Sequence, residues 1–94
     1  MNLLALFCDG TGNYVFPPEP LPGQQVTLQF RTAADDVDSV CLLAGGREYE
    51  MEKRSTAGIF DFYAVTFTLG NENLRYSFRI SSGTEVWYYN QFGV

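Results

Sequence analysis

Apolar and polar side chains alternate along two segments of this 94-residue chain with the period of two that is typical of half-buried β-strands. The first segment is QVTLQFR, residues 25–31, and the second is LRYSFRI, residues 74–80. Both are predicted to be strands. The side chains that we expect to face the core are Val26, Leu28, Phe30, Tyr76, Phe78 and Ile80.

A central strand and a hairpin are expected between these two segments. Residues 39–43, SVCLL, are apolar on both faces, which is typical of a strand with a neighbour on either side. The Gly-Gly pair that follows predicts a hairpin turn into a strand over residues 47–53, in which Tyr49 and Met51 face inward. The opposite face carries three carboxylates and is expected to be a solvated surface rather than a catalytic pair. These carboxylates belong to Glu48, Glu50 and Glu52.

The rest of the chain is predicted to form strands separated by turns. Residues 59–69 are rich in β-branched and aromatic side chains, and turn sequences occupy residues 70–73 and 81–84. Residues 17–23 hold all four prolines and are expected to form an extended connector. No segment of ten or more residues shows helical periodicity, and the Cys, Trp, Cys pattern of antibody domains is missing. The sequence therefore predicts an all-β, immunoglobulin-like antiparallel β-sandwich of about seven strands, in a single domain spanning residues 1–94.

The stretch EVWYYNQF, which begins at Glu85, gathers four large aromatic rings near the end of the chain. With a period of two, Val86 and Tyr88 share one face of a strand, while Trp87 and Tyr89 share the other. We expect Val86 and Tyr88 to complete the core and Trp87 and Tyr89 to face outward. Flat rings beside polar groups suit both sugars and protein interfaces. The alternative is that both faces of this strand are covered and that all of its rings pack in the interior.

Composition excludes several classes of function. The net charge is -5 and the six basic residues are scattered, which argues against nucleic acid as a partner. The absence of histidine removes the commonest general base and transition-metal ligand, and with them any Ser-His or Cys-His pair. The acidic residues 35–38 are expected to form a turn rather than a calcium loop, and the glycine-rich residues 8–13 a loop rather than a phosphate site. We predict no catalytic residue, metal site or cofactor in this chain.

The N-terminal stretch MNLLALFCDG lacks the features of a targeting segment. Its apolar run is five residues long, no basic residue precedes it, and bulky Phe7 stands before Cys8, where a lipoprotein signal would need a small residue. No segment approaches the roughly 20 apolar residues of a membrane helix, so no membrane partner is expected. Cys8 and Cys41 are expected to be buried thiols, because nothing indicates an oxidising compartment. This reasoning favours a cytoplasmic location.

An ordered set of short motifs resembles carbohydrate-binding module family 34, the N-terminal domain of neopullulanases, cyclomaltodextrinases and maltogenic amylases in glycoside hydrolase family 13. The most specific motifs are FDFY at residues 60–63, which resembles the family's F-D-Y-[WY], and RYSF at residues 75–78, which resembles its R-Y-x-F. The resemblance covers essentially the whole chain. The other landmarks, in order, lie at Leu28 to Thr32, Asp35 to Leu42, Met51, Ile59, Gly83, Tyr88 and Gly93.

The resemblance implies a non-catalytic accessory domain followed by a catalytic (β/α)8 barrel after Val94. In that family the domain often drives dimerisation by packing against the partner's barrel, which narrows the active-site cleft for small maltodextrins and cyclodextrins. Some members also bind α-glucans on this domain. We expect contacts with a barrel or a glucan at Trp87, Tyr89 and Tyr14. The alternatives are a direct α-glucan-binding module, or a structural or adhesive immunoglobulin-like module with no connection to glucans.

Overall fold

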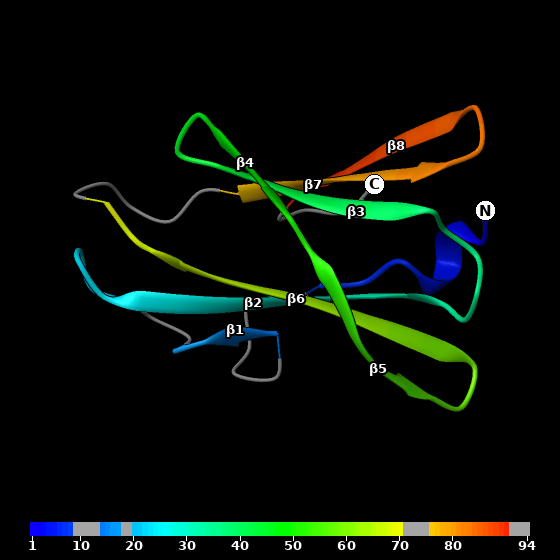
Figure 1. Cartoon of the computed structure of the whole chain (residues 1–94), viewed down its shortest axis with the longest axis horizontal. Coiled ribbons are helices and arrows are strands. Elements are labelled where there is room, and N and C mark those ends of the chain that lie inside the picture. The colour runs from blue at the N-terminus through cyan, green and yellow to red at the C-terminus, as the bar shows by residue number, and fades with distance from the viewer. Residues whose placement is uncertain (9–13, 18–19, 71–75, 91–94) are drawn as a thin grey trace.

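Two antiparallel four-stranded sheets pack face to face in the computed structural model, which describes residues 1–8, 14–17, 20–70 and 76–90 (Figure 1). Sheet A has the strand order β1-β2-β6-β5, and sheet B has the order β4-β3-β7-β8. The predicted all-β sandwich is confirmed. The elements are the 3-10 helix η1 (Leu3–Ala5), β1 (Val15–Phe16), β2 (Gln25–Ala33), β3 (Ser39–Ala44), β4 (Arg47–Glu50), β5 (Glu52–Ala57), β6 (Phe60–Thr68), β7 (Tyr76–Ser82) and β8 (Glu85–Asn90).

The described residues form eight strands rather than about seven, partly because the chain changes sheets at Met51. The strand expected over residues 47–53 ends at Glu50, where β4 pairs with β3 in sheet B, and β5 then pairs with β6 in sheet A. Met51 itself is buried between the sheets, and its N–H donates a hydrogen bond to the Val40 carbonyl at 2.9 Å. The predicted loop at 8–13, connector at 17–23 and turn at 70–73 lie largely or partly outside the described residues.

The core includes most of the alternating side chains predicted from the sequence. Phe30 of sheet A and Phe78 of sheet B meet across the sandwich with ring centroids 4.5 Å apart. The predicted central strand is confirmed, because β3 lies between β4 and β7. Of the six predicted core residues, Tyr76 is half-buried at the rim. The fully buried ones are Val26, Leu28, Phe30, Phe78 and Ile80.

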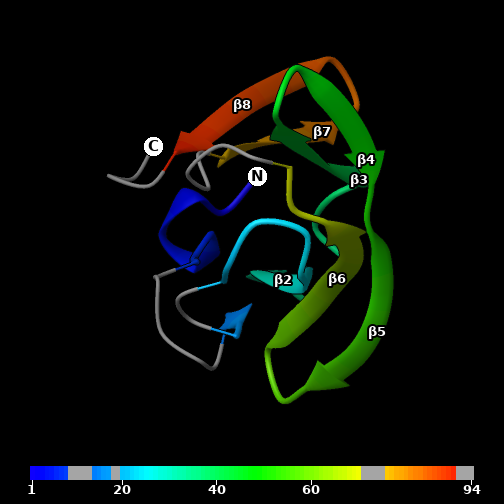
Figure 2. The ribbon, with the colours of Figure 1, turned by 90° about the vertical axis from the view of Figure 1, so that its left-hand side faces the viewer.

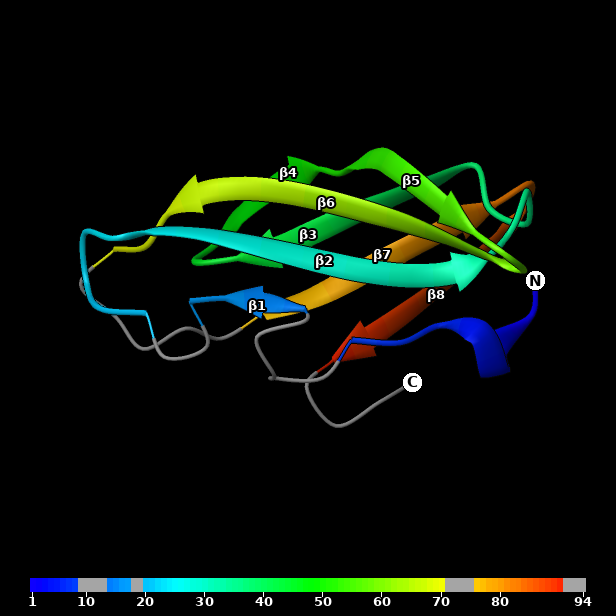
Figure 3. The same cartoon turned by 90° about the horizontal axis from the view of Figure 1, so that it is seen from below.

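The N-terminal apolar run packs into the sandwich beside β2 and β8 (Figures 2 and 3). Ala5 and Leu6 are buried, and the backbones of Phe7 and Arg31 exchange two hydrogen bonds of 3.0 and 2.9 Å. The Arg31 guanidinium lies 4.9 Å from the ring centroid of Phe7 and 4.2 Å from that of Phe60. Its Nε donates to the Ala5 carbonyl at 3.1 Å. A cation held between two rings therefore fixes the N-terminal segment to sheet A, at the edge of β2 where Phe7 pairs with Arg31.

A buried carboxylate joins the turn after β2 to the β5–β6 hairpin. Asp61 is 2% exposed and accepts hydrogen bonds from the Thr56 hydroxyl at 2.6 Å and from the Asp35 N–H at 2.9 Å. The Lys53 ammonium lies 3.3 Å from the same carboxylate. The Thr56 hydrogen bond first, and the Asp35 N–H second, hold the pKa of Asp61 below its usual value, against the opposing effect of burial.

We expect Asp61→Asn to lower the free energy of unfolding by about 1–3 kcal/mol at neutral pH. The reason is that the Thr56 hydroxyl and the Asp35 N–H then no longer donate to a charged carboxylate. The depressed pKa means that the carboxylate stabilises the fold fully above its unfolded pKa of about 3.9. This contribution is lost as the pH falls through the lower pKa of the folded state. Urea unfolding from neutral to strongly acidic pH should therefore show the gap between wild type and variant closing below about pH 4.

Asp38→Asn is the control. The Asp38 carboxylate accepts a hydrogen bond from the Gly83 N–H in the β7–β8 turn and takes no part in the contacts of Asp61. A gap between wild type and Asp61→Asn that stays constant down to the acid limit would contradict this assignment.

Candidate functional site

A two-residue turn joins β7 to β8 and sets the register of the last strand. The register pairs Ile80 with Trp87 and Phe78 with Tyr89. Directly opposed residues of an antiparallel pair point to the same face, and both β7 residues are fully buried. Trp87 and Tyr89 therefore lie on the inner face of sheet B, which is the reverse of the orientation expected from the sequence.

Val86 and Tyr88, which were expected to complete the core, lie on the outer face instead. They pair with Ser81 and Arg79, and their exposed fractions are 50% and 57%. The expectation was wrong because β8 carries large side chains on both faces, so alternation alone does not show which face is buried. The length of the turn between β7 and β8 could have shown the correct face. Because side chains alternate along each strand, any loop with an even number of residues places Trp87 on the same face as Ile80.

Two of the three residues expected at an interface, Tyr89 and Tyr14, are half-buried and contact the N-terminal segment. The Tyr89 ring packs against Phe30 with a centroid separation of 5.3 Å, and its hydroxyl donates to the Cys8 carbonyl at 3.3 Å. The Tyr14 ring meets Phe7 edge-on at 5.1 Å. Both rings therefore help to hold the N-terminal segment in place.

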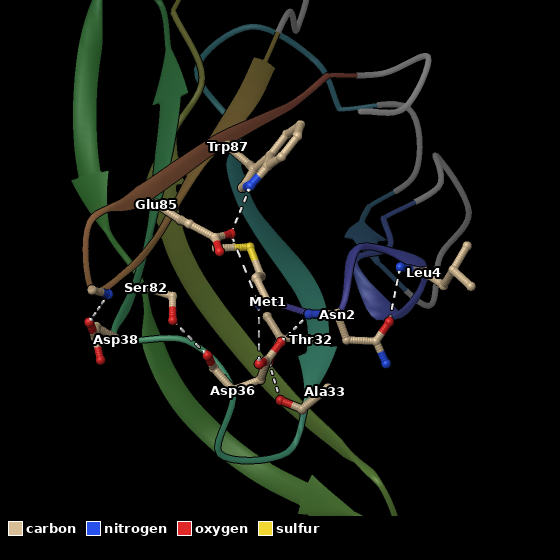
Figure 4. Close-up of polar contacts among 11 residues, drawn as sticks. Met1, Asn2, Leu4, Thr32, Ala33, Asp36, Asp38, Ser82, Glu85 and Trp87 are labelled. Carbon is tan, nitrogen blue, oxygen red and sulfur yellow. Dashed lines mark hydrogen bonds and ion pairs between the residues drawn. The ribbon is translucent and has the colours of Figure 1, made fainter.

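Trp87, the third residue, is 38% exposed although it lies on the inner face. Opposite it, sheet A ends in β1, which has only two residues, so the edge of sheet B is incompletely covered. The indole Nε1 donates to Glu85 at 3.1 Å. Figure 4 shows Trp87 on β8 and Leu4 on η1, and Leu4 is 93% exposed. We call the two exposed side chains of Leu4 and Trp87 together the β8 flank.

The acidic residues 35–38 form a turn, as predicted. This turn makes hydrogen bonds to the N-terminal segment and to the β7–β8 turn. The Asp36 carboxylate accepts the Asn2 N–H at 2.6 Å, and the Asp38 carboxylate accepts the Gly83 N–H at 2.7 Å (Figure 4). One turn therefore positions both the start of the N-terminal segment and the β7–β8 turn.

A second surface, on the outer face of sheet B, was missed by the sequence reasoning. Tyr88 lies directly opposite Arg79, whose guanidinium donates to the Glu48 carboxylate at 2.6 Å. This hydrogen bond, followed by the charge of Glu48, raises the pKa of Arg79. We call Tyr88, Arg79 and Glu48 the outer-face cluster. The cross-strand pairing that builds it becomes visible only once the register of β8 is known.

The described surface offers contacts rather than reactive groups. Among residues 1–8, 14–17, 20–70 and 76–90, no three or more His, Cys, Asp or Glu side chains are grouped so that they could hold a metal ion. Neither Cys8 nor Cys41 forms a disulfide; the first is buried and the second half-buried. No helix within the described part of the chain is long and apolar enough to cross a bilayer.

Comparison with known proteins identifies the fold. Over residues 1–94 the chain matches the family described as alpha amylase, N-terminal ig-like domain. Among solved structures it matches a cyclomaltodextrinase with a TM-score of 0.81 and 26% sequence identity over 94% of this chain. The chain spans 16% of the length of that protein. No curated protein sequence matches it.

These matches agree with the immunoglobulin-like sandwich and with the resemblance to the N-terminal domain of neopullulanase-like enzymes, both of which are confirmed. Because the family match covers every residue and the two sheets form the expected sandwich, the chain belongs to the family of alpha-amylase N-terminal immunoglobulin-like domains.

Proposed function

We propose that this chain is the non-catalytic N-terminal domain of a neopullulanase-like glycoside hydrolase, and that it contributes to dimerisation and to shaping the active-site cleft for maltodextrins and cyclodextrins. The observation that carries the proposal is the family match over residues 1–94, supported by the match to a cyclomaltodextrinase of which this chain spans 16%. In this proposal a (β/α)8 barrel follows Val94 and supplies the catalytic carboxylates.

The β8 flank is the proposed contact surface for a barrel of the same or the partner subunit. Leu4 is almost fully exposed, and covering apolar surface contributes about 25 cal/mol per Å². Trp87 adds a ring of the type that dominates the binding energy of protein interfaces. Tyr89 and Tyr14 support this surface indirectly. Their contacts with Cys8 and Phe7 hold the N-terminal segment that carries Leu4.

Removing residues 1–94 from the full-length protein should convert a dimer into a monomer and lower the ratio of its activity on β-cyclodextrin to its activity on starch. The reason is that the partner's domain would no longer narrow the cleft. Sedimentation equilibrium and paired rate assays measure the two effects. A full-length protein that is monomeric, and whose substrate ratio is indifferent to the deletion, would refute the proposal.

A matched pair of point variants separates the flank from the domain as a whole. Leu4→Glu places a charge on the β8 flank and should weaken the dimer at least about tenfold, a loss of about 1.4 kcal/mol. Ile59→Glu is the control, because Ile59 is also highly exposed but lies on the β5–β6 turn, at the opposite edge of sheet A from β1. Equal dimer affinities for the two variants would remove the flank from the proposal.

A second candidate function, direct binding of α-glucans, is favoured by the outer-face cluster. Sugars stack their C–H faces on aromatic rings and hydrogen-bond through their hydroxyls. Tyr88 is 57% exposed, and the paired Arg79 and Glu48 beside it offer donors and acceptors. Because the Arg79 charge is matched by that of Glu48, the pair suits a neutral polyhydroxylated ligand. The corrected orientation of β8 thus moves the proposed stacking residue from Trp87 to Tyr88.

Titration of the chain with maltohexaose, followed by NMR, should shift the resonances of Tyr88 and Arg79 and leave the Trp87 indole unchanged. Tyr88→Ala should weaken binding about fivefold, because a stacking contact contributes about 1 kcal/mol. Trp87→Phe is the control and should bind like wild type, since residue 87 lies on the other face. Shifts centred on Trp87, or none at millimolar sugar, would eliminate this site.

A further inference from the structure

Within the described residues the sandwich has four edge strands, and three of them are protected against pairing with another chain. β1 has only two residues. β4 has four residues, of which three are charged. β5 carries Glu52, Lys53 and Arg54, and its register is interrupted between Lys53 and Ser55. Short length, charged side chains and bulges are the features by which β-proteins prevent edge-to-edge association.

β8, the fourth edge, is the least protected of the four. It is six residues long, contains no proline, lysine or arginine, and pairs with β7 in an unbroken register. Its one charged residue, Glu85, stands at the start of the strand. Aromatic and β-branched residues of high strand propensity occupy the four positions that follow. A regular, apolar edge strand of this kind is a site at which another strand can pair.

The turn shows which backbone groups β8 presents at this edge. In a two-residue hairpin the residues that flank the turn, here Ser82 and Glu85, form a hydrogen-bonded pair, and such pairs alternate along the ladder. Trp87 therefore directs its N–H and C=O toward β7, while Val86 and Tyr88 direct theirs away from it. Neither Val86 nor Tyr88 makes a backbone hydrogen bond to any other segment of the described chain.

We propose that β8 pairs antiparallel with β8 of a second copy of this chain, about a two-fold axis that passes beside Trp87. Val86 of each copy then lies opposite Tyr88 of the other and exchanges both backbone hydrogen bonds with it. The two copies of sheet B become one continuous sheet. The Trp87 residues of the two copies form the central, non-hydrogen-bonded pair, with Cα atoms about 4.5 Å apart.

A second copy is the occupant because the edge is self-complementary. Two of its outward-directed residues, Val86 and Tyr88, stand symmetrically on either side of Trp87, so a two-fold axis there matches their donors to acceptors. On the outer face, Val86 meets the ring of Tyr88, a favourable cross-strand pair. The two Glu85 side chains lie at opposite ends of the pairing, each facing Tyr89 of the other copy. A chain of net charge -5 thus associates along an edge with little like-charge repulsion.

Pairing of one short strand buries less surface than a standard protein interface, so we expect a weak, concentration-dependent dimer with a Kd of roughly micromolar to millimolar. The inference rests on the β8 edge and not on the presence of a catalytic barrel. The 94-residue chain tests it directly, whereas the proposed function is tested by deletion from the full-length protein. The failure of one therefore leaves the other standing.

Disulfide trapping measures the geometry of the pairing. Trp87→Cys should yield a covalent dimer under mild oxidation, because Cα atoms about 4.5 Å apart lie within the range that a disulfide spans. Val86→Cys and Tyr88→Cys are the controls: their symmetric partners would be roughly 8 Å apart, which is too far. Peptide mapping distinguishes the 87–87 link from links that involve Cys8 or Cys41. Absence of the 87–87 link, or equal trapping at all three positions, would overturn the proposal.

Val86→Pro provides a second test in which Trp87 is kept. It removes an N–H that points away from β7, so the fold should be preserved while the dimer weakens at least tenfold. Circular dichroism checks the fold, and sedimentation equilibrium up to millimolar concentration measures association. Thr66→Lys is the control: Thr66 is exposed on sheet A, away from β8, so this variant should dimerise like wild type. A wild-type chain that stays monomeric throughout would overturn the proposal.

Discussion

The β7–β8 turn fixes the face on which every aromatic ring of the last strand lies. Gly83 adopts a φ of +59°, a left-handed conformation that glycine accepts without strain, and its N–H is held by the Asp38 carboxylate. With this turn in place, Trp87 must lie opposite Ile80 and Tyr88 opposite Arg79. A turn one residue longer would exchange the two faces, because side chains alternate with a period of two. The β8 flank and the outer-face cluster both depend on this one constraint.

A second consequence of the fold is the incomplete cover over the inner face of β8. Sheet A ends on that side in the very short β1, so the N-terminal segment supplies much of the missing layer. Arg31 fastens the segment through two aromatic contacts and backbone pairing with Phe7, and Tyr89 fastens it through the Cys8 carbonyl. What this layer leaves exposed is Trp87 and Leu4. The domain is thus well packed at its centre and leaves these two large apolar side chains exposed beside β8.

The sequence predicted the interior well and the surface less well. Strands β2 and β7 alternate between apolar and polar residues, so their buried faces followed directly from the pattern. The sheet change at Met51 could not be predicted, because residues 47–57 carry no turn signal there and the change depends on a side chain entering the core. The phase of β8 was missed because Val86, Trp87, Tyr88 and Tyr89 are all large; only the parity of the turn distinguishes the faces. The pairing of Arg79 with Glu48 lies between strands that are far apart in sequence, and it needs the complete sheet order.

The central claim is that Trp87 and Tyr89 bond to β7 while Val86 and Tyr88 present their backbone to a partner. Amide hydrogen exchange, measured residue by residue at low and at high protein concentration, tests it most directly. At low concentration the account predicts protected amides at Trp87 and Tyr89 and fast exchange at Val86 and Tyr88. At high concentration the Val86 and Tyr88 amides should become protected as well. Protection at Val86 and Tyr88 that does not depend on concentration, or fast exchange at Trp87, would contradict it.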